Sequence, residues 1–430
     1  GQGGIGVSRI SGEDAIAVAD RIFVAVSGKK LVDAKGYTAH FGHVFNNDEK
    51  IDECIATVFR APHSYTGEDV VELSCHGGIF VTKTVLRSVL DNGAMCAEAG
   101  EFTKRAFLNG KMDLTQAEAV MDIISAKSGA AAKSALSVHE GALSKKINDV
   151  KDDLVNRAAH LCAWADYPEE DIPEIEFESL KNAVANSKIK LEDLLNNYDA
   201  GKAVREGIDT VIVGRPNVGK STLMNLITGF DKSIVTDIAG TTRDIVEETA
   251  IVKNITLHLS DTAGIRDADN AIEKIGVDKA KDSIKDADLV LYIVDGTTPL
   301  NDNDFSIMDM IKDKKSITII NKNDMDIVVD NLLITSHINT KIIELSAKEG
   351  TGKEKLHNLL KEMFFKEELS YNDEIYITNL RHKGLLYDTK ESLNKVLESI
   401  SLDMGEDFFT IDLMSAYASL GKIIGEELED

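Results

Sequence analysis

Gly214-Arg-Pro-Asn-Val-Gly-Lys-Ser221 is the stretch that decides the fold of the middle of this chain. The apolar run Thr210–Val213 precedes it, and apolar residues at helical spacing follow it. A glycine-rich turn between a strand and a helix points backbone N–H groups at a phosphate, and the helix N-terminus adds a favourable dipole. Lys220 would neutralise phosphate charge and the Ser221 hydroxyl would ligate Mg²⁺. The stretch therefore predicts a loop that binds a nucleotide triphosphate.

Two further motifs follow that would serve the phosphate side of the site. In Gly-Thr-Thr-Arg-Asp, Thr241 and Thr242 can give a hydroxyl to Mg²⁺ and sense the γ-phosphate. Asp261-Thr-Ala-Gly264 ends an expected strand, which places Asp261 beside the metal and the Gly264 N–H near the γ-phosphate. Each motif alone could be a surface turn, but their order along the chain is that of a nucleotide site.

Another pair of motifs would select the base. Asn321-Lys-Asn-Asp324 ends a strand, and the Asp324 carboxylate can accept hydrogen bonds from guanine N1–H and N2–H₂, which adenine does not offer. Ser346-Ala-Lys348 follows a last strand and would place a backbone N–H near guanine O6. All five motifs follow strands, where open α/β sheets bind their ligands. The expected GTP-binding residues are Gly214, Asn217, Val218, Gly219, Lys220, Ser221, Thr222, Asp261, Thr262, Ala263, Gly264, Asn321, Lys322, Asp324, Ser346, Ala347 and Lys348.

The residue that orients the attacking water is not obvious. Ile265 stands where signalling GTPases carry a glutamine, so either hydrolysis is very slow or another group positions the water. Glu273 is one candidate, although a solvated helix carboxylate is the preferred interpretation from the residues alone. Arg243 could act as an arginine finger or lie idle at the surface.

Composition limits the other possibilities. The 48 basic and 73 acidic residues give a net charge of −25, which argues against unspecific binding to nucleic acid or anionic lipid. No apolar run approaches the roughly 20 residues that cross a bilayer. With no basic-then-apolar leader at Gly1, a cytoplasmic protein that lacks its own N-terminus is expected. The four cysteines form no C-x-x-C pair, so reduced, mostly buried thiols are expected.

The pattern of apolar residues and glycines changes along the chain, which predicts several domains. Residues 1–108 mix apolar runs with Gly-rich turns and suggest an α+β domain, and residues 109–205 are helical, with a capping box expected at Thr115 and Glu118. Residues 206–365 alternate strands and helices, as in a doubly wound parallel sheet, and residues 366–430 are helical again. The expected fold is therefore multidomain, with a Ras-like α/β P-loop GTPase domain inserted into an all-α domain.

Motifs outside the GTPase domain carry a resemblance to a known family. The chain resembles the MnmE (TrmE) family of tRNA-modifying GTPases over essentially its whole length. The stretches that carry the resemblance are Gly3-Gly-Ile-Gly-Val-Ser-Arg-Ile-Ser11, Ser64-Tyr-Thr-Gly-Glu-Asp-Val-Val-Glu-Leu73, His76-Gly-Gly78, Gly100-Glu-Phe-Thr-Lys-Arg-Ala-Phe-Leu-Asn-Gly-Lys111 and Leu114-Thr-Gln-Ala-Glu-Ala119.

The resemblance implies a specific reaction. With the flavoprotein GidA (MnmG), family members add a carboxymethylaminomethyl-type group to C5 of the tRNA wobble uridine. The one-carbon unit comes from 5-formyltetrahydrofolate or a related folate, held by the N-terminal domain, which also makes the homodimer. The family's folate positions match Arg9, Glu72 and Lys111; as isolated residues they would be interpreted as surface ion pairs.

The resemblance also implies K⁺ activation and a catalytic role for Glu273. Asn217 matches the family's K⁺ ligand, and carbonyls around Thr236, Ile238 and Thr241 would complete the site, with Mg²⁺ on Ser221 and Thr242. K⁺ would stabilise charge between the phosphates as two GTPase domains pair transiently. Glu273, Lys220 and Thr242 are the catalytic residues that the resemblance implies.

One departure concerns the end of the chain. The family ends in a Cys-x-Gly-Lys motif, whereas this sequence stops at Asp430 in what the pattern suggests is the helix that leads to it. GTP hydrolysis is expected to survive this loss, and completion of tRNA modification is in doubt. Two alternatives stay open: a ribosome-assembly or RNA-binding GTPase switch related to Era, and a nucleotide-gated scaffold that does not hydrolyse GTP.

Overall fold

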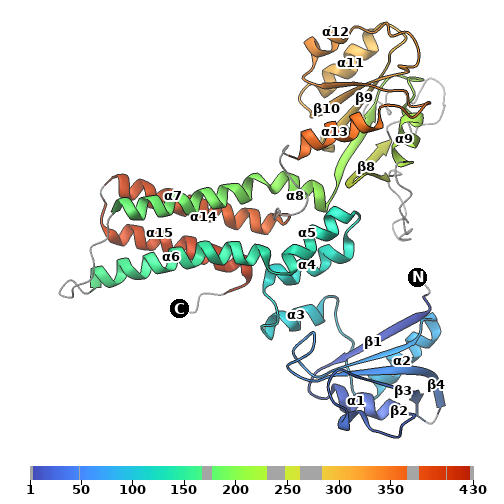
Figure 1. Cartoon of the computed structure of the whole chain (residues 1–430), viewed down its shortest axis with the longest axis vertical. Helices are drawn as coiled ribbons and strands as arrows, with labels where there is room; N and C mark the ends of the chain where they lie inside the picture. Colours follow the sequence, from blue (N-terminus) through green and yellow to red (C-terminus); the bar gives the residue numbers. More distant parts are fainter. Residues whose placement is uncertain are drawn as a thin grey trace. The chain divides into compact units, whose positions relative to one another are not determined.

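The computed structural model describes residues 3–47, 49–166, 177–229, 247–261, 283–365, 377–402 and 404–426. The chain forms two compact units. One contains Gly1–Met121, His139–Ser144 and Ile424–Glu427, and the other contains Asp122–Val138, Lys145–Ile423 and Leu428–Asp430 (Figure 1). The predicted fold class is confirmed: an N-terminal α+β domain, helices, and an α/β domain inserted between helical segments.

The first unit is built on a five-stranded antiparallel sheet with strand order β1-β5-β4-β3-β2. Helices α1 and α2 pack against one face, where the side chains of alternate strand residues are buried. The sequence did not predict β2, because three residues are too few to show an alternating pattern. The elements are β1 (Ile5–Ser11), α1 (Ala15–Ile22), β2 (Phe23–Ala25), β3 (Thr38–Asn46), β4 (Glu49–Phe59), β5 (Val70–His76), α2 (Ile79–Asp91) and α3 (Glu101–Leu108).

The helix α4 begins with a capping pair two residues earlier than the one that the sequence predicted. Asp113 and Gln116 form the reciprocal pair instead: the Gln116 N–H donates to Asp113 Oδ1, and the Asp113 N–H donates to Gln116 Oε1. The prediction of Thr115 and Glu118 was wrong because both pairs fit the same spacing. Thr115 is buried in the first turn, and its hydroxyl lies 2.8 Å from that of Ser144.

The longer helices bury apolar residues three and four positions apart, which is the pattern of packed helices. In α6, Ile147, Val150 and Leu154 are buried in this way. Figure 1 shows α6, α7, α14 and α15 running alongside one another, and α7 contacts α14. The helices are α4 (Leu114–Ser125), α5 (Gly129–His139), α6 (Ala142–Asp166), α7 (Phe177–Asn196), α8 (Tyr198–Arg205), α14 (Leu380–Ser401) and α15 (Glu406–Ile424).

The inserted domain has a six-stranded sheet with strand order β11-β10-β9-β6-β8-β7. The strands pair in parallel as predicted, except that β7 pairs antiparallel with β8 through a two-residue turn in which Lys253 has φ +57°. The elements are β6 (Ile208–Val213), α9 (Lys220–Thr228), β7 (Glu247–Val252), β8 (Ile255–Asp261), β9 (Leu289–Asp295), α11 (Asp302–Ile311), β10 (Ser316–Asn321), α12 (Asn331–His337), β11 (Lys341–Glu344) and α13 (Lys353–Phe364).

Helices cover both faces of this sheet, which explains why its strands are continuous apolar runs. Ile212 of β6 packs in the same core as residues of α9 and α13, whereas its neighbours Val211 and Val213 pack with residues of α11 and α12. The nucleotide motifs follow the carboxyl ends of β6, β10 and β11.

The cysteines agree only in part with the prediction. All four are free, and Cys54 and Cys75 are buried, but Cys96 and Cys162 are exposed, so the expectation of mostly buried thiols holds for half of them. Burial raises the pKa of Cys54 to about 12, which keeps this thiol protonated and unreactive. No helix in the described parts of the chain is long and apolar enough to cross a membrane.

Candidate functional site

The predicted phosphate loop lies between β6 and α9, as its sequence requires. Asn217 has φ +63° and Gly219 has φ +102°, so the chain turns sharply there, in the kind of backbone conformation whose successive N–H groups can bind an anion. A Cβ on Gly219 would lie 2.4 Å from Asn321 Nδ2, and one on Gly214 would lie 2.4 Å from the Ile293 carbonyl oxygen. These close approaches leave room only for glycine.

Lys220, Ser221 and Thr222 form the first turn of α9. The Lys220 ammonium donates to the carbonyl oxygens of Gly214 (2.9 Å) and Arg215 (2.7 Å), which holds it at the phosphate loop. Ser221 and Thr222 are exposed at the N-terminus of α9, where a hydroxyl can reach a bound cation, whereas Val218 is buried beneath the loop. The first turn of α9 therefore carries one ammonium held at the phosphate loop and two exposed hydroxyl residues.

Asn321 joins the phosphate loop to both base-selecting motifs. Its Nδ2 donates to the Val218 carbonyl oxygen (2.8 Å), and its Oδ1 accepts from the Ala347 N–H (2.9 Å). The side chain is buried, so these bonds form away from water. One amide therefore holds together three loops that are far apart in the sequence.

The base-selecting residues have partners that the sequence did not reveal. Lys322, at φ +68°, donates to Asp295 Oδ2 (2.6 Å), and Asp295 also accepts from the N–H and the hydroxyl of Thr297. Burial acts to raise the pKa of Asp295, but the bonds from Lys322 and Thr297 outweigh it and the pKa is lowered. Asp295 belongs to none of the nucleotide motifs. Its position at the carboxyl end of β9 is the one feature of the sequence that could have marked it as a residue of the site.

Asp324 is exposed, as a carboxylate that must meet a base needs to be. A hydrogen bond from the side chain of Ser346 lowers the pKa of Asp324, followed in size by a bond from its own backbone. The shift keeps Asp324 ionised, and therefore able only to accept, at neutral pH. Ser346 and Ala347 are buried, and Lys348 is exposed beside them.

Several predicted site residues lie outside the described residues. They are Thr236, Ile238, Thr241, Thr242, Thr262, Ala263, Gly264 and Glu273, together with Arg243 and Ile265. The backbone of Asp261 ends β8 in register with Ile212 of β6, which places this residue at the same sheet edge as the phosphate loop.

In the N-terminal domain the structure brings together two of the three predicted folate residues. Arg9 and Glu72 are directly opposite on β1 and β5, and their side chains form an ion pair of 2.6 Å. The Arg9 guanidinium also lies over the rings of Tyr65 and Phe102, 5.4 Å from each centroid. Lys111 donates to the Pro62 carbonyl oxygen (3.0 Å), so it lies against the loop that carries Tyr65.

A second set of polar side chains lies beside this loop. Ser11 donates to Glu68 (2.7 Å), and Glu68 accepts from Arg105 (3.2 Å). Glu68 also lines a hollow of about 600 Å³ with Glu13, Ala61, Gly67, Asp69 and Asn109. No spacing rule pointed to Ser11, Glu68 or Arg105, although all three belong to the stretches that carry the family resemblance.

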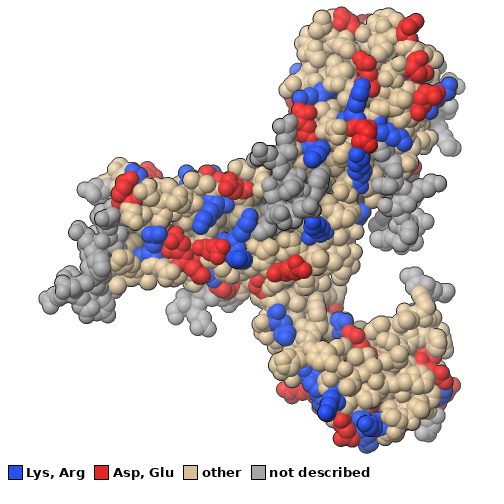
Figure 2. All heavy atoms as spheres, viewed as in Figure 1, with Lys and Arg blue, Asp and Glu red and all other residues tan. Residues whose placement is uncertain are grey.

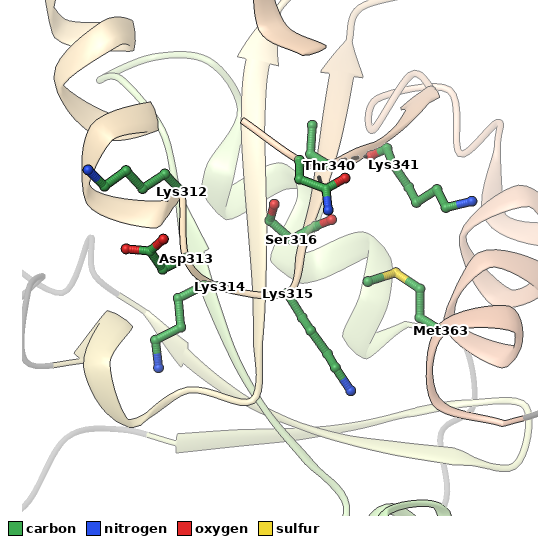
Figure 3. A pocket seen from close by; sticks show the side chains of 9 residues that line it. Lys312, Asp313, Lys314, Lys315, Ser316, Thr340, Lys341 and Met363 are labelled. Carbon is green, nitrogen blue, oxygen red and sulfur yellow. Dashed lines mark hydrogen bonds between the residues drawn. The ribbon is translucent and has the colours of Figure 1, made fainter. Parts of the chain in front are cut away.

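Another hollow of the inserted domain is excluded as the nucleotide site. Its volume is about 360 Å³, and among its lysines Lys312 and Lys315 directly precede β10, while Lys341 is the first residue of β11 (Figure 3). This is the amino edge of the sheet, opposite the edge that carries the motifs. Two of its lysines are also engaged: Lys314 donates to the Ala287 and Lys285 carbonyl oxygens, and Lys341 pairs with Glu362 at 2.9 Å.

Comparison with known proteins gives the family. The profile described as GTP-binding protein TrmE N-terminus matches residues 1–111, and that of the MnmE helical domain matches residues 114–430. The tRNA modification GTPase MnmE of Lachnoclostridium phytofermentans is 47% identical over 428 residues, which cover 99% of this chain and 93% of that protein. The chain belongs to the MnmE family. The MnmE of Clostridioides difficile is 43% identical over 431 residues, covering 100% of this chain and 94% of its own.

Membership of the MnmE family agrees with the geometry of the site, and the chain is a P-loop GTP hydrolase. Among solved structures, Era of Aquifex aeolicus bound to GDP·AlF₄⁻ is 28% identical and covers 43% of this chain and 66% of its own, with a TM-score of 0.28. The match of the MnmE profiles to the N-terminal and helical regions is what separates this chain from an Era-like switch.

Proposed function

We propose that this chain is a K⁺-stimulated GTPase that works with a flavoprotein of the GidA (MnmG) type. The pair adds a carboxymethylaminomethyl-type group to C5 of the tRNA wobble uridine, and GTP hydrolysis drives a conformational change in the process. The observation that carries the proposal is the Asn321 amide, which bonds the Val218 carbonyl and the Ala347 N–H and so assembles phosphate and guanine recognition into one site. Membership of the MnmE family supports the tRNA part.

The residues present suit the two cations that the proposal requires. Ser221, together with Thr242, would hold Mg²⁺, and the exposure of Ser221 at the N-terminus of α9 supports this role. Asn217 would give an oxygen to K⁺, with carbonyls of Thr236, Ile238 and Thr241, and the positive φ of Asn217 sets it at the turn of the phosphate loop. When bound, these cations supply positive charge to the phosphate oxygens.

The other residues of the site would position the phosphates, the attacking water and the guanine base. Lys220, now bonded to two loop carbonyls, would turn toward the β- and γ-phosphates, while Glu273 would orient water in place of the glutamine that Ile265 replaces. Asp324 would accept from guanine N1–H and N2–H₂. Because Ala347 already donates to Asn321, the Lys348 N–H is the one that we expect to face guanine O6.

In the N-terminal domain, Arg9, Glu72 and Lys111 would hold a folate. The cations would bind its carboxylates, and Glu72 would accept from the N–H groups of the pterin. The side chains of Arg9 and Glu72 are 37% and 25% exposed, so a ligand can reach them. The rings of Tyr65 and Phe102, which contact Arg9, add an aromatic surface beside them. This combination of charge and ring surface supports the assignment.

The uncovered face of the N-terminal sheet supports the proposed homodimer. Val7 and Ile55 are both opposite Ser74, and Phe41 is opposite Ile55, so three of the four neighbouring strands in this row contribute an apolar residue and β5 contributes Ser74. Val7, Phe41 and Ile55 are 55%, 54% and 46% exposed, on the face away from α1 and α2. Soluble proteins seldom leave such a row in water. We propose that a second copy of the chain covers it, while the GTPase domains pair only transiently.

Charge reversal on this row tests the homodimer. We expect Phe41→Glu to convert the protein from a particle of twice 46.9 kDa to one of 46.9 kDa in multi-angle light scattering, because a buried unpaired carboxylate opposes association. Leu332→Glu is the matched control, since Leu332 is an exposed apolar residue of the inserted domain. A dimeric Phe41→Glu protein, or a monomeric wild type, would show that this face is not the interface.

Two measurements of GTP turnover test the hydrolysis mechanism: one exchanges K⁺ for Na⁺, and the other replaces Glu273. At equal ionic strength we expect GTP turnover at least about tenfold faster in K⁺ than in Na⁺, because only K⁺ fits a site that takes the arginine finger's part. Glu273→Ala should lower turnover in K⁺ by roughly 10²-fold without weakening GTP binding, as expected for a group that positions water. Glu248→Ala, which changes an exposed carboxylate on β7, should leave turnover unchanged.

The same variants test the tRNA part. In cells that rely on this protein, mass spectrometry should find the modified wobble uridine with the wild-type and Glu248→Ala proteins, and unmodified uridine with Glu273→Ala. Equal turnover in K⁺ and Na⁺ would refute the K⁺ site alone. Unmodified uridine with an active wild-type GTPase would instead refute the tRNA reaction.

A further inference from the structure

The second residue of the phosphate loop, Arg215, turns its side chain away from the nucleotide position and into the domain. Its Nε forms an ion pair with Asp304 Oδ2 at 3.0 Å, without the geometry of a hydrogen bond, and its Nη2 donates to the Thr298 hydroxyl (3.0 Å). Only 15% of the Arg215 side chain is exposed, and the Asp304 side chain is fully buried. This is a buried ion pair between the phosphate loop and the start of α11.

Asp304 is held by further bonds that fix its place. Its Oδ1 accepts from the Tyr292 hydroxyl (3.1 Å), and its Oδ2 accepts from the Asn301 N–H (3.0 Å) in the capping box of α11. Tyr292 is itself fully buried in β9. Burial, followed by the nearby Asp304 carboxylate, raises the pKa of Tyr292, so its hydroxyl stays protonated and continues to donate. The Asp304 carboxylate is therefore held in place by hydrogen bonds from both α11 and β9.

The backbone of Arg215 is part of the phosphate-binding machinery even though its side chain is not. The Arg215 carbonyl oxygen accepts from the Lys220 ammonium at 2.7 Å. Pro216 follows directly, which restricts the backbone of Arg215 to extended conformations. An anchor on the Arg215 side chain therefore fixes the direction of a carbonyl that orients Lys220.

A buried ion pair adds little stability compared with apolar residues of the same volume, because both charges lose their hydration. Its advantage is geometric, since the planar guanidinium can contact the Asp304 carboxylate and bond the Thr298 hydroxyl at the same time in few orientations. The ion pair therefore contributes more to fixing the position of the phosphate loop than to the stability of the domain.

We propose that Arg215 is a positioning residue for nucleotide binding: anchored by Asp304 and Tyr292, it holds the phosphate loop and Lys220 in the geometry that receives the phosphates. The role belongs to these three side chains and does not depend on the cation or on tRNA. Loss of the anchor leaves every phosphate-binding group present but less well placed, so affinity falls more than the rate of the bound complex.

The test uses the full chain with Arg215→Ala, Arg215→Lys, Asp304→Asn and the double variant Arg215→Ala/Asp304→Asn. Asp304→Asn keeps an oxygen for the Asn301 N–H, and the double variant leaves no unpaired buried charge. We expect each Arg215 variant to bind fluorescent GDP roughly 10- to 100-fold more weakly and to raise the KM for GTP similarly, with kcat within about threefold of wild type. Arg215→Lys should not rescue binding, because an ammonium lacks the planar fork.

The double variant separates positioning from stability. Its unfolding temperature should recover from that of Arg215→Ala, while its GDP affinity stays low. Arg205→Ala is the matched control: it breaks another Arg–Asp pair, with Arg205 Nε 2.8 Å from Asp122 Oδ1, and should leave GDP affinity unchanged. Wild-type affinity in the double variant, or an equal loss in Arg205→Ala, would overturn the proposal.

Discussion

Asp324→Asn is expected to change the nucleotide preference of this protein from GTP to XTP. In the wild type the Asp324 carboxylate can only accept, which matches the N1–H and N2–H₂ donors of guanine. An asparagine amide presents one acceptor and one donor instead. Its donor then faces the guanine N2–H₂ group, and two donors are left without acceptors.

Xanthine removes this conflict, because it carries an oxygen where guanine carries N2–H₂. The Asn amide can donate to that oxygen and accept from N1–H. Sites built to bond a polar group discriminate by about 10⁴-fold against a ligand that leaves them unpaired. We expect GTP affinity to fall by about 10³-fold or more and XTP affinity to rise above it, measured by competition against fluorescent GDP and fluorescent XDP.

The control for charge is Asp326→Asn, which makes the same change at an exposed position of the same loop. It should keep the preference for GTP. If Asp324→Asn still prefers GTP, the Asp324 carboxylate does not contact the base. If it binds neither nucleotide, the exchange has damaged the loop, and Ser346, whose side-chain hydrogen bond lowers the pKa of Asp324, becomes the residue to test.

The sequence predicted the parts of the site that recur with fixed spacing. Gly214–Ser221 and Asn321–Asp324 were recognised by their residues and by the apolar run that comes before each motif. The structure confirms that these runs are the strands β6 and β10. The parallel sheet was predicted from apolar runs that are buried on both faces. These features depend on local order along the chain, which a sequence shows directly.

The missed parts depend on contacts between distant residues. Asp304 pairs with Arg215, and Asp295 pairs with Lys322, but nothing in a chain with 73 acidic residues marks these two carboxylates as buried. The antiparallel β7 was missed because its pairing is set by the two-residue turn at Lys253. The capping box was placed wrongly because two overlapping pairs fit one rule, and only tertiary contacts of Thr115 decided between them.

Asn321 is the contact on which the assembly of the site depends most, so its removal should have the widest effect. Asn321→Ala deletes the donor to the Val218 carbonyl and the acceptor for the Ala347 N–H at once. Each buried backbone group left without a partner costs about 1–3 kcal/mol, so the two together destabilise the local structure by roughly 2–6 kcal/mol. The phosphate loop and the Ser346–Lys348 turn should then open independently.

Hydrogen–deuterium exchange measures this opening directly. In Asn321→Ala, the amides of Gly214–Thr228 and of Ser346–Lys348 should exchange roughly 10²-fold faster, since 1.4 kcal/mol corresponds to a factor of ten, while β1 to β5 of the N-terminal domain stay unchanged. GDP affinity should fall by a similar factor, because the ligand must now order both loops.

Asn323→Ala is the matched control. Asn323 is only partly buried, and among the described residues its side chain accepts one long bond, from the Thr351 hydroxyl at 3.4 Å, so little should change. Faster exchange at the phosphate loop alone would mean that Asn321 supports that loop without coupling it to the base. Faster exchange at both, with loss of GDP binding, is the result that identifies Asn321 as the residue that makes phosphate and guanine recognition one cooperative site.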